Sequence, residues 1–143
     1  MDETSAGLAA GERGSAIVEF VFLGVLLLIP IVYLVITASQ LQAASYAAVG
    51  AADHAAKVFV GAATESEGAA KANDAAGRAV ANMGIDGGAA SLNYSCSGPC
   101  LQSGTTVTVS VKVELALPFL PPGLDARVGS ASSTSTHRVD RFG

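Results

Sequence analysis

The sequence contains few of the side chains from which a large core is built. Among its 143 residues there is no tryptophan, aromatic residues make up 6% and charged residues 14%, compared with roughly 25% charged residues in an ordinary soluble domain. Hydrophobic residues make up 50%, with alanine prominent among them. We expect a chain so poor in large apolar side chains to depend on a membrane or on neighbouring subunits for stability.

Basic residues are also scarce. Eight Lys and Arg residues stand against twelve Asp and Glu residues, which gives a formal net charge of −4. Nucleic-acid binding relies on clustered positive charge to neutralise phosphates. The composition therefore predicts no nucleic-acid partner.

The sequence contains no grouping of residues that would form a catalytic or metal site. His54 and His137 are the only histidines and are isolated in the sequence, and no serine or cysteine stands in a nucleophile-elbow or phosphate-loop motif. Neither histidine has the spacing that a zinc site with the two cysteines would need. We predict no enzyme activity, no metal and no cofactor, and we interpret His137 as a solvated side chain.

The two cysteines lie close together in the segment "CSGPC", as Cys96 and Cys100. A pair at this spacing around a Gly-Pro turn favours a short disulfide-closed loop in an oxidising compartment. A thioredoxin-type redox site would need two intervening residues and a surrounding βαβ pattern, and both are missing. The pair is predicted to be structural.

One long apolar stretch dominates the N-terminal part. Residues 1–14 are polar, small and expected to be disordered. Residues 16–36 are apolar except for Glu19, and a helix of this length spans about 31 Å, or one hydrocarbon thickness. Pro30 would kink such a helix, which membrane helices tolerate. The stretch predicts a single transmembrane pass.

The helical pattern continues to residue 60. Small residues recur at every fourth position in two rows: Ala43, Ala47, Ala51 and Ala55, and Ala44, Ala48, Ala52 and Ala56. Such rows let helices approach closely, but alanine is also simply a good helix former, and the sequence leaves both interpretations open. A second helix is predicted from a Thr64/Glu67 capping box to Gly84.

Strands are predicted in the C-terminal part. Residues 105–117 alternate valine or leucine with mostly polar residues, which indicates a strand with one buried face. Residues 91–96 and 126–139 are further candidates. The expected fold is α+β, with a leader at 1–14, a transmembrane and extended helix at 15–60, and a small exterior domain with an antiparallel sheet at 61–143.

The junction between leader and helix carries a recognisable motif. In "RGSAIVEF" a glycine precedes a small residue, and a glutamate followed by an aromatic residue stands at the fifth and sixth positions after it. With the apolar helix in register, this resembles the type IV prepilin signal. The resemblance implies that a prepilin peptidase cuts between Gly14 and Ser15, and that Glu19 and Phe20 become the fifth and sixth residues of the mature subunit.

The chain resembles a TadE-like pseudopilin or minor pilin of the tight-adherence (Tad) pilus system. The similarity is strong over residues 12–57 and loose after them. It implies a pilin-like subunit of the cytoplasmic membrane with its C-terminal part outside, whose partners are the prepilin peptidase, membrane lipid and other pilin subunits packed helix to helix. It also implies that Glu19 pairs with the N-terminal amine of an adjacent subunit. The alternative is that Glu19 has no partner in another subunit and that its carboxylate simply reaches water at the membrane interface.

Two other functions fit the same sequence. One is a secreted domain behind a signal peptide, although the apolar run is long for a signal core and the preceding residues lack net positive charge. The other is an uncleaved single-pass anchor for an exterior binding domain that is not part of a pilus. The mature N-terminus distinguishes the three.

Overall fold

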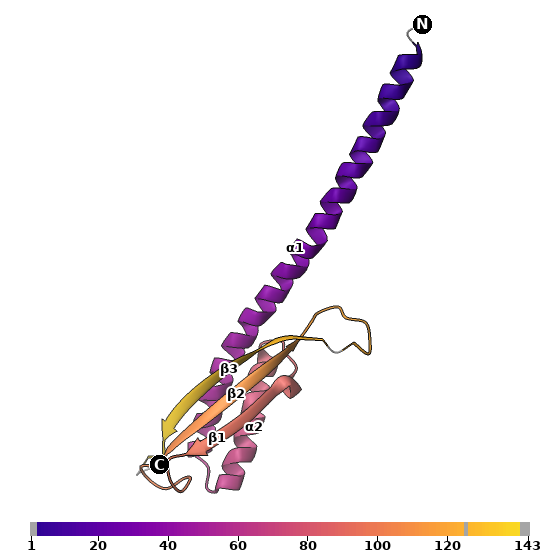
Figure 1. Ribbon diagram of the computed structural model, residues 1–143. Coiled ribbons are helices and arrows are strands. Elements are labelled where there is room, and N and C mark those ends of the chain that lie inside the picture. Colours follow the sequence, from indigo (N-terminus) through magenta and orange to yellow (C-terminus); the bar gives the residue numbers. More distant parts are fainter. Residues whose placement is uncertain (1–2, 125, 141–143) are drawn as a thin grey trace. The chain divides into compact units, whose positions relative to one another are not determined.

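The computed structural model describes residues 3–124 and 126–140 and divides into two compact units, Met1–Ala38 and Ser39–Gly143. The elements in chain order are helix α1 (Glu3–Val60), helix α2 (Glu65–Asn82), the 3-10 helix η1 (Gly87–Ala89) and strands β1 (Ala90–Cys96), β2 (Thr106–Ala116) and β3 (Arg127–Arg138) (Figure 1). The expected α+β fold, with a long apolar N-terminal helix, a second helix and a small antiparallel sheet, is confirmed. The boundary between the units lies inside α1.

The first unit is a single stretch of α1. Its apolar side chains are exposed on every side of the helix, as with Phe20, which is 78% exposed, and Pro30 lies within the helix. Among the described residues, this is the one helix long and apolar enough to cross a membrane. Residues 3–14, expected to be disordered, are helical, because alanine, leucine and glutamate favour helix in this segment.

The sheet of the second unit has the order β1–β2–β3, and both pairs of strands are antiparallel. The predicted alternation of β2 is confirmed, since Val107, Val109, Val111 and Val113 are completely buried. On the opposite face, the hydroxyl of Thr108 lies 3.0 Å from that of Thr136, and the hydroxyl of Ser110 lies 2.9 Å from that of Thr134. One face of the sheet is therefore dry and the other is a ladder of hydroxyl groups.

The alanine rows of α1 form the other half of this core. Ala44, Ala48, Ala52 and Ala56 are completely buried, as is Phe59, and they form one hydrophobic cluster with the valines of β2. In this unit the small residues are therefore core residues that pack within the chain itself, whether or not they were also chosen as helix formers. This packing also explains why α1 residues from Ser39 onward belong to the second unit.

Helix α2 has the ends that its sequence predicts. The Thr64 hydroxyl accepts a hydrogen bond from the backbone N–H of Glu67 at 3.2 Å, and Gly84, just past the helix, has a φ of +77°, a left-handed conformation that glycine adopts without strain. Ala72, Ala76 and Val80 form the buried face of α2. Met83 follows at the same spacing but is 45% exposed because it is the C-cap residue, where the helix ends.

The close packing of the alanine face generates a first prediction. Replacing Ala48 by leucine would force three extra carbons into filled space and should lower the free energy of unfolding by about 1–3 kcal/mol. Val49→Leu is the matched control, because Val49 is 57% exposed and surface changes usually stay within about 0.5 kcal/mol. Urea titration of the intact chain in detergent micelles measures both variants. Equal midpoints would contradict a closely packed alanine face.

Candidate processing and assembly site

The residues of the prepilin-like motif share one exposed segment of α1. Gly14, Ser15, Glu19 and Phe20 are all exposed, and a side chain built on Gly14 would meet no atom within 4 Å. Ser15 and Glu19 are four residues apart, so they are neighbours on the helix surface. The segment is accessible from all sides in the isolated chain.

The Glu19 carboxylate has no ion-pair or hydrogen-bond partner among the described residues. It stands near the start of the apolar stretch of α1, whose side chains are exposed. A carboxylate within hydrocarbon costs roughly 2.5–3.5 kcal/mol at a helix centre on insertion scales, and less near an end. A partner for Glu19 would have to come from water, from lipid head groups or from another chain.

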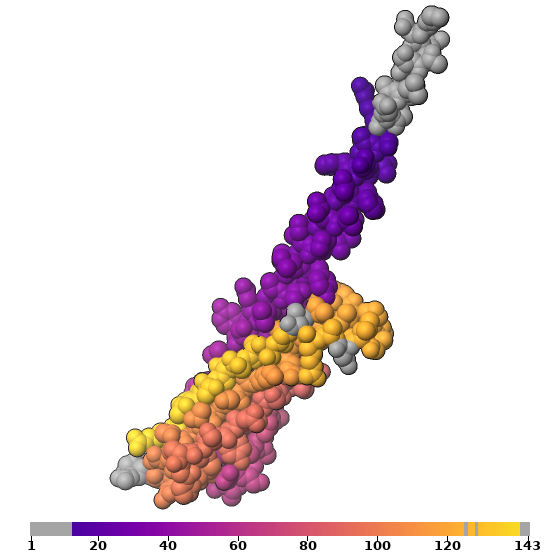
Figure 2. Space-filling view, in the orientation of Figure 1, coloured from indigo at the N-terminus to yellow at the C-terminus, as the bar shows by residue number. Residues whose placement is uncertain are grey.

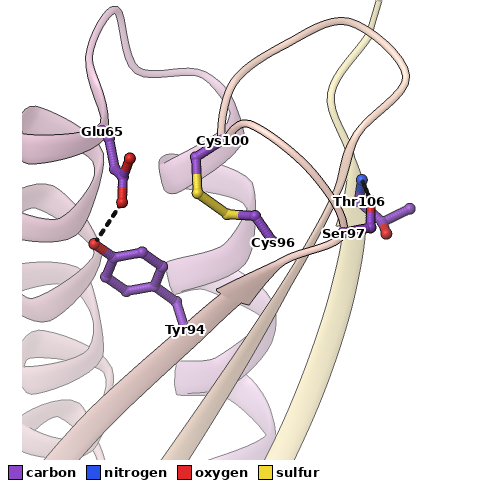
Figure 3. The surroundings of a disulfide bond; sticks show 6 residues. All are labelled: Glu65, Tyr94, Cys96, Ser97, Cys100 and Thr106. Atoms are coloured by element: carbon purple, nitrogen blue, oxygen red, sulfur yellow. Dashed lines mark hydrogen bonds between the residues drawn. A yellow bond between two sulfur atoms is a disulfide. The ribbon is translucent and has the colours of Figure 1, made fainter.

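The cysteines lie at one end of the sheet and form a disulfide, with a Cα–Cα distance of 5.5 Å (Figure 3). Beside them, on the same face of β1, the ring of Tyr94 packs on Phe59 with centroids 4.7 Å apart. The Tyr94 hydroxyl donates a hydrogen bond to the Glu65 carboxylate at 3.0 Å. This hydrogen bond, together with partial desolvation, raises the pKa of Tyr94 above its usual value.

The disulfide loop is joined to the C-terminal end of β3. Residues 97 and 106 exchange two hydrogen bonds at 3.0 Å, one of them accepted by the Ser97 hydroxyl (Figure 3). Gly104 N–H donates to the Val139 carbonyl at 2.9 Å, and Val139 N–H donates to the Thr105 carbonyl at 2.8 Å. The β1–β2 connection, which contains the disulfide, therefore fastens Val139 to the sheet.

His137 is not the solvated side chain that the sequence suggested. Its Nε2 lies 3.0 Å from Asp53 Oδ1 on α1, and Lys57 Nζ donates to the other oxygen of Asp53 at 2.6 Å. The Lys57 hydrogen bond and then the His137 hydrogen bond hold the pKa of Asp53 below its usual value. The Asp53/Lys57 pair has the four-residue spacing typical of an ion pair on a helix, whereas nothing in the sequence signals the contact with His137.

A shallow hollow of about 520 Å³ lies at the opposite end of the sheet from the disulfide. Its lining residues come from α1, from the α2–β1 connection and from the β2 and β3 ends, and include Gln40, Ala43, Asp86, Glu114, Leu115 and Arg127. Arg127 and Glu114 form an ion pair there. In the part of the chain that the structure describes, no three His, Cys, Asp or Glu residues are grouped so as to hold a metal ion.

Comparison with protein-family models, with curated proteins and with solved structures finds no match to this chain. Its functional interpretation therefore depends on its own residues and on the motif around Gly14.

The disulfide generates a second prediction. In the chain-entropy account, opening so short a loop lowers the free energy of unfolding by about 2 kcal/mol. The double variant Cys96→Ser/Cys100→Ser should therefore unfold at lower urea concentration than the oxidised wild type in micelles. Wild type kept in a reductant serves as the control and should behave like the double variant. An unchanged midpoint in both would contradict the stabilising role of the disulfide.

A third prediction concerns acid stability. Because the pKa of Asp53 is lowered in the folded chain, its ionised form stabilises the fold above the usual aspartate pKa of about 3.9. This contribution is lost as the pH falls through the lowered value. Urea midpoints measured in micelles from pH 6 to pH 2 should fall less steeply for Asp53→Asn than for wild type. Identical acid profiles would show that the His137 and Lys57 contacts do not stabilise ionised Asp53.

Proposed function

We propose that this chain is a pilin-like subunit of the TadE type, which residues 16–36 insert in the cytoplasmic membrane and which takes part in assembling a tight-adherence or type IV-like pilus. In this proposal a prepilin peptidase cuts between Gly14 and Ser15, residues 39–143 lie outside the membrane, and the protein is structural and not catalytic. The observation that carries the proposal is an exposed prepilin-like motif in register with an apolar stretch of α1 whose side chains are exposed.

Cleavage would give Glu19 a chemical partner. Cutting the Gly14–Ser15 bond creates a free ammonium group at Ser15, which would be close to the apolar stretch in every mature subunit. A carboxylate without a partner is penalised in an apolar helix bundle, whereas one paired with the ammonium of a neighbouring subunit is compensated. Because only one axial offset between two helices brings these charges together, the pair would select the register of assembly.

The exposed face of α1 supports packing with other subunits. Beyond the apolar stretch, Leu41, Tyr46 and Val49 are 47%, 72% and 57% exposed, while the alanines on the other side of the helix are buried in the second unit. Exposed apolar side chains of α1 are thus available to a neighbouring helix both in the apolar stretch and between residues 41 and 49. This is the surface by which we propose that pilin subunits associate.

A membrane-anchored exterior binding domain outside any pilus is the second candidate. The hollow lined by Gln40, Asp86, Glu114 and Arg127 favours it, since such a cavity with both polar and apolar lining could hold a small ligand. This function would require no cleavage at Gly14.

The mature N-terminus tests the proposed function. Intact mass and N-terminal sequencing of the protein from its native host should show a start at Ser15, and this start should disappear in a strain that lacks the prepilin peptidase. A start at Met1 in both strains would favour the anchored binding domain, and a start beyond residue 36 in both would indicate a secreted domain. Either result contradicts the proposed processing.

Glu19 tests the proposed assembly. Glu19→Gln keeps the size of the side chain but removes its charge, so the variant should be cleaved normally and enter the assembled structure several-fold less efficiently. Glu12→Gln is the matched control, because it lies in the segment that cleavage removes. Assembly of the Glu19 variant at the wild-type level would show that the carboxylate only reaches water at the interface.

A further inference from the structure

The loop between β2 and β3 displays apolar side chains to solvent. Residues 117–124, "LPFLPPGL", contain no charged or hydrogen-bonding side chain. Phe119 is 85% exposed and Leu124 is 61% exposed. Figure 2 shows this segment, in orange to yellow, as a protrusion from the rest of the second unit. Exposed large apolar side chains gathered at one place indicate a contact surface.

The backbone holds these side chains outward. Leu117 N–H donates to the Ala126 carbonyl at 3.0 Å and closes the base of the loop, and Leu124 N–H donates to the Pro121 carbonyl at 3.2 Å. Between these last two residues, Pro122 and Gly123 form a turn in which Gly123 has a φ of +98°, as in a type II turn. Phe119 itself has a φ of +61°, a conformation that costs energy for a bulky residue and is found at functional sites.

The base of the loop lies near the point where the chain leaves the apolar stretch. Leu115, Ala116 and Arg127, the residues that flank the loop, line the same hollow as Gln40 and Ala43 of α1. Gln40 is four residues after Ile36, the last residue of the apolar stretch. Four residues reach at most about 14 Å even when fully extended. If residues 16–36 span a membrane, the base of the loop is therefore close to its surface, whatever the angle between the two units.

We propose that residues 117–124 insert into the interfacial region of the same membrane that residues 16–36 span. Phe and Leu side chains enter the boundary between head groups and acyl chains, as they do on interfacial helices. The guanidinium group of Arg127, which is exposed although one of its nitrogens pairs with Glu114, would remain at the level of the lipid phosphates. Lipid is the favoured partner because the short connection between the apolar stretch and the second unit by itself keeps the loop within reach of the membrane.

Such a contact would give the second unit two attachments to the membrane. The covalent one is α1, and the other would be the loop at the hollow end of the sheet. Figure 1 shows the loop and the disulfide segment at opposite ends of the sheet. The inference rests on the membrane-spanning part of the proposed function, and it requires neither cleavage at Gly14 nor pilus assembly.

The absence of tryptophan from the chain allows a direct test with single-tryptophan variants. The intact protein is reconstituted in vesicles of phosphatidylethanolamine and phosphatidylglycerol, some of which contain lipids brominated along the acyl chain. Phe119→Trp reports on the loop, and Leu124→Trp is a second probe in case the first disturbs the fold. Ser103→Trp, in the exposed loop at the disulfide end, is the matched control, and Leu27→Trp reports on the apolar stretch.

We expect brominated lipid to quench tryptophan at 119 or 124 several-fold more than tryptophan at 103. Equal quenching at all three positions, with tryptophan at 27 strongly quenched, would overturn the loop contact and leave the membrane span intact. An unquenched tryptophan at 27 would overturn the span and the loop contact together. Blue-shifted emission at 119 that depends on protein concentration, without quenching by brominated lipid, would assign the loop to a protein partner and also overturn the proposal.

Discussion

The contact between the alanine face of α1 and the valine face of β2 is the constraint on which the second unit depends. Alanine contributes only a methyl group, so the helix can lie close to the sheet, but little apolar area is buried per residue. Phe59 and Val80 are the large side chains that the helices add to this core. A core this thin needs support elsewhere, which the disulfide, the hydroxyl ladder and the Asp53–His137 contact provide.

Helix α1 changes its surroundings along its length while its backbone remains helical. A helix that is apolar all round needs lipid or protein on every side, whereas a helix with one small apolar face packs on a sheet. The first description fits residues 16–36 and the second fits residues 39–60. The change comes after Ile36, where Thr37, Ser39 and Gln40 bring polar side chains into the helix. One element can therefore belong to two environments without a connecting loop.

Local sequence patterns predicted the elements that depend on near neighbours. The valine alternation gave β2, and Thr64 with Glu67 gave the start of α2. Features that depend on register or on distant partners could not be predicted. His137 lies opposite Val107 in the sheet, which turns it toward the helix side, but its partner Asp53 is 84 residues away. The sequence of residues 117–124 predicted only that a strand ends there. It could not predict that the side chains are exposed, because exposure depends on the tertiary fold.

In the function that we propose, Glu19 has two possible ammonium partners. After cleavage it would lie in the second turn of a helix that starts at Ser15, and helical side chains lean toward the N-terminus. Its carboxylate would thus approach the amine of its own chain and the positive end of the helix dipole. A subunit waiting in the membrane would already be partly compensated. Assembly would then exchange one ammonium partner for another, which is a smaller free-energy change than pairing a bare charge.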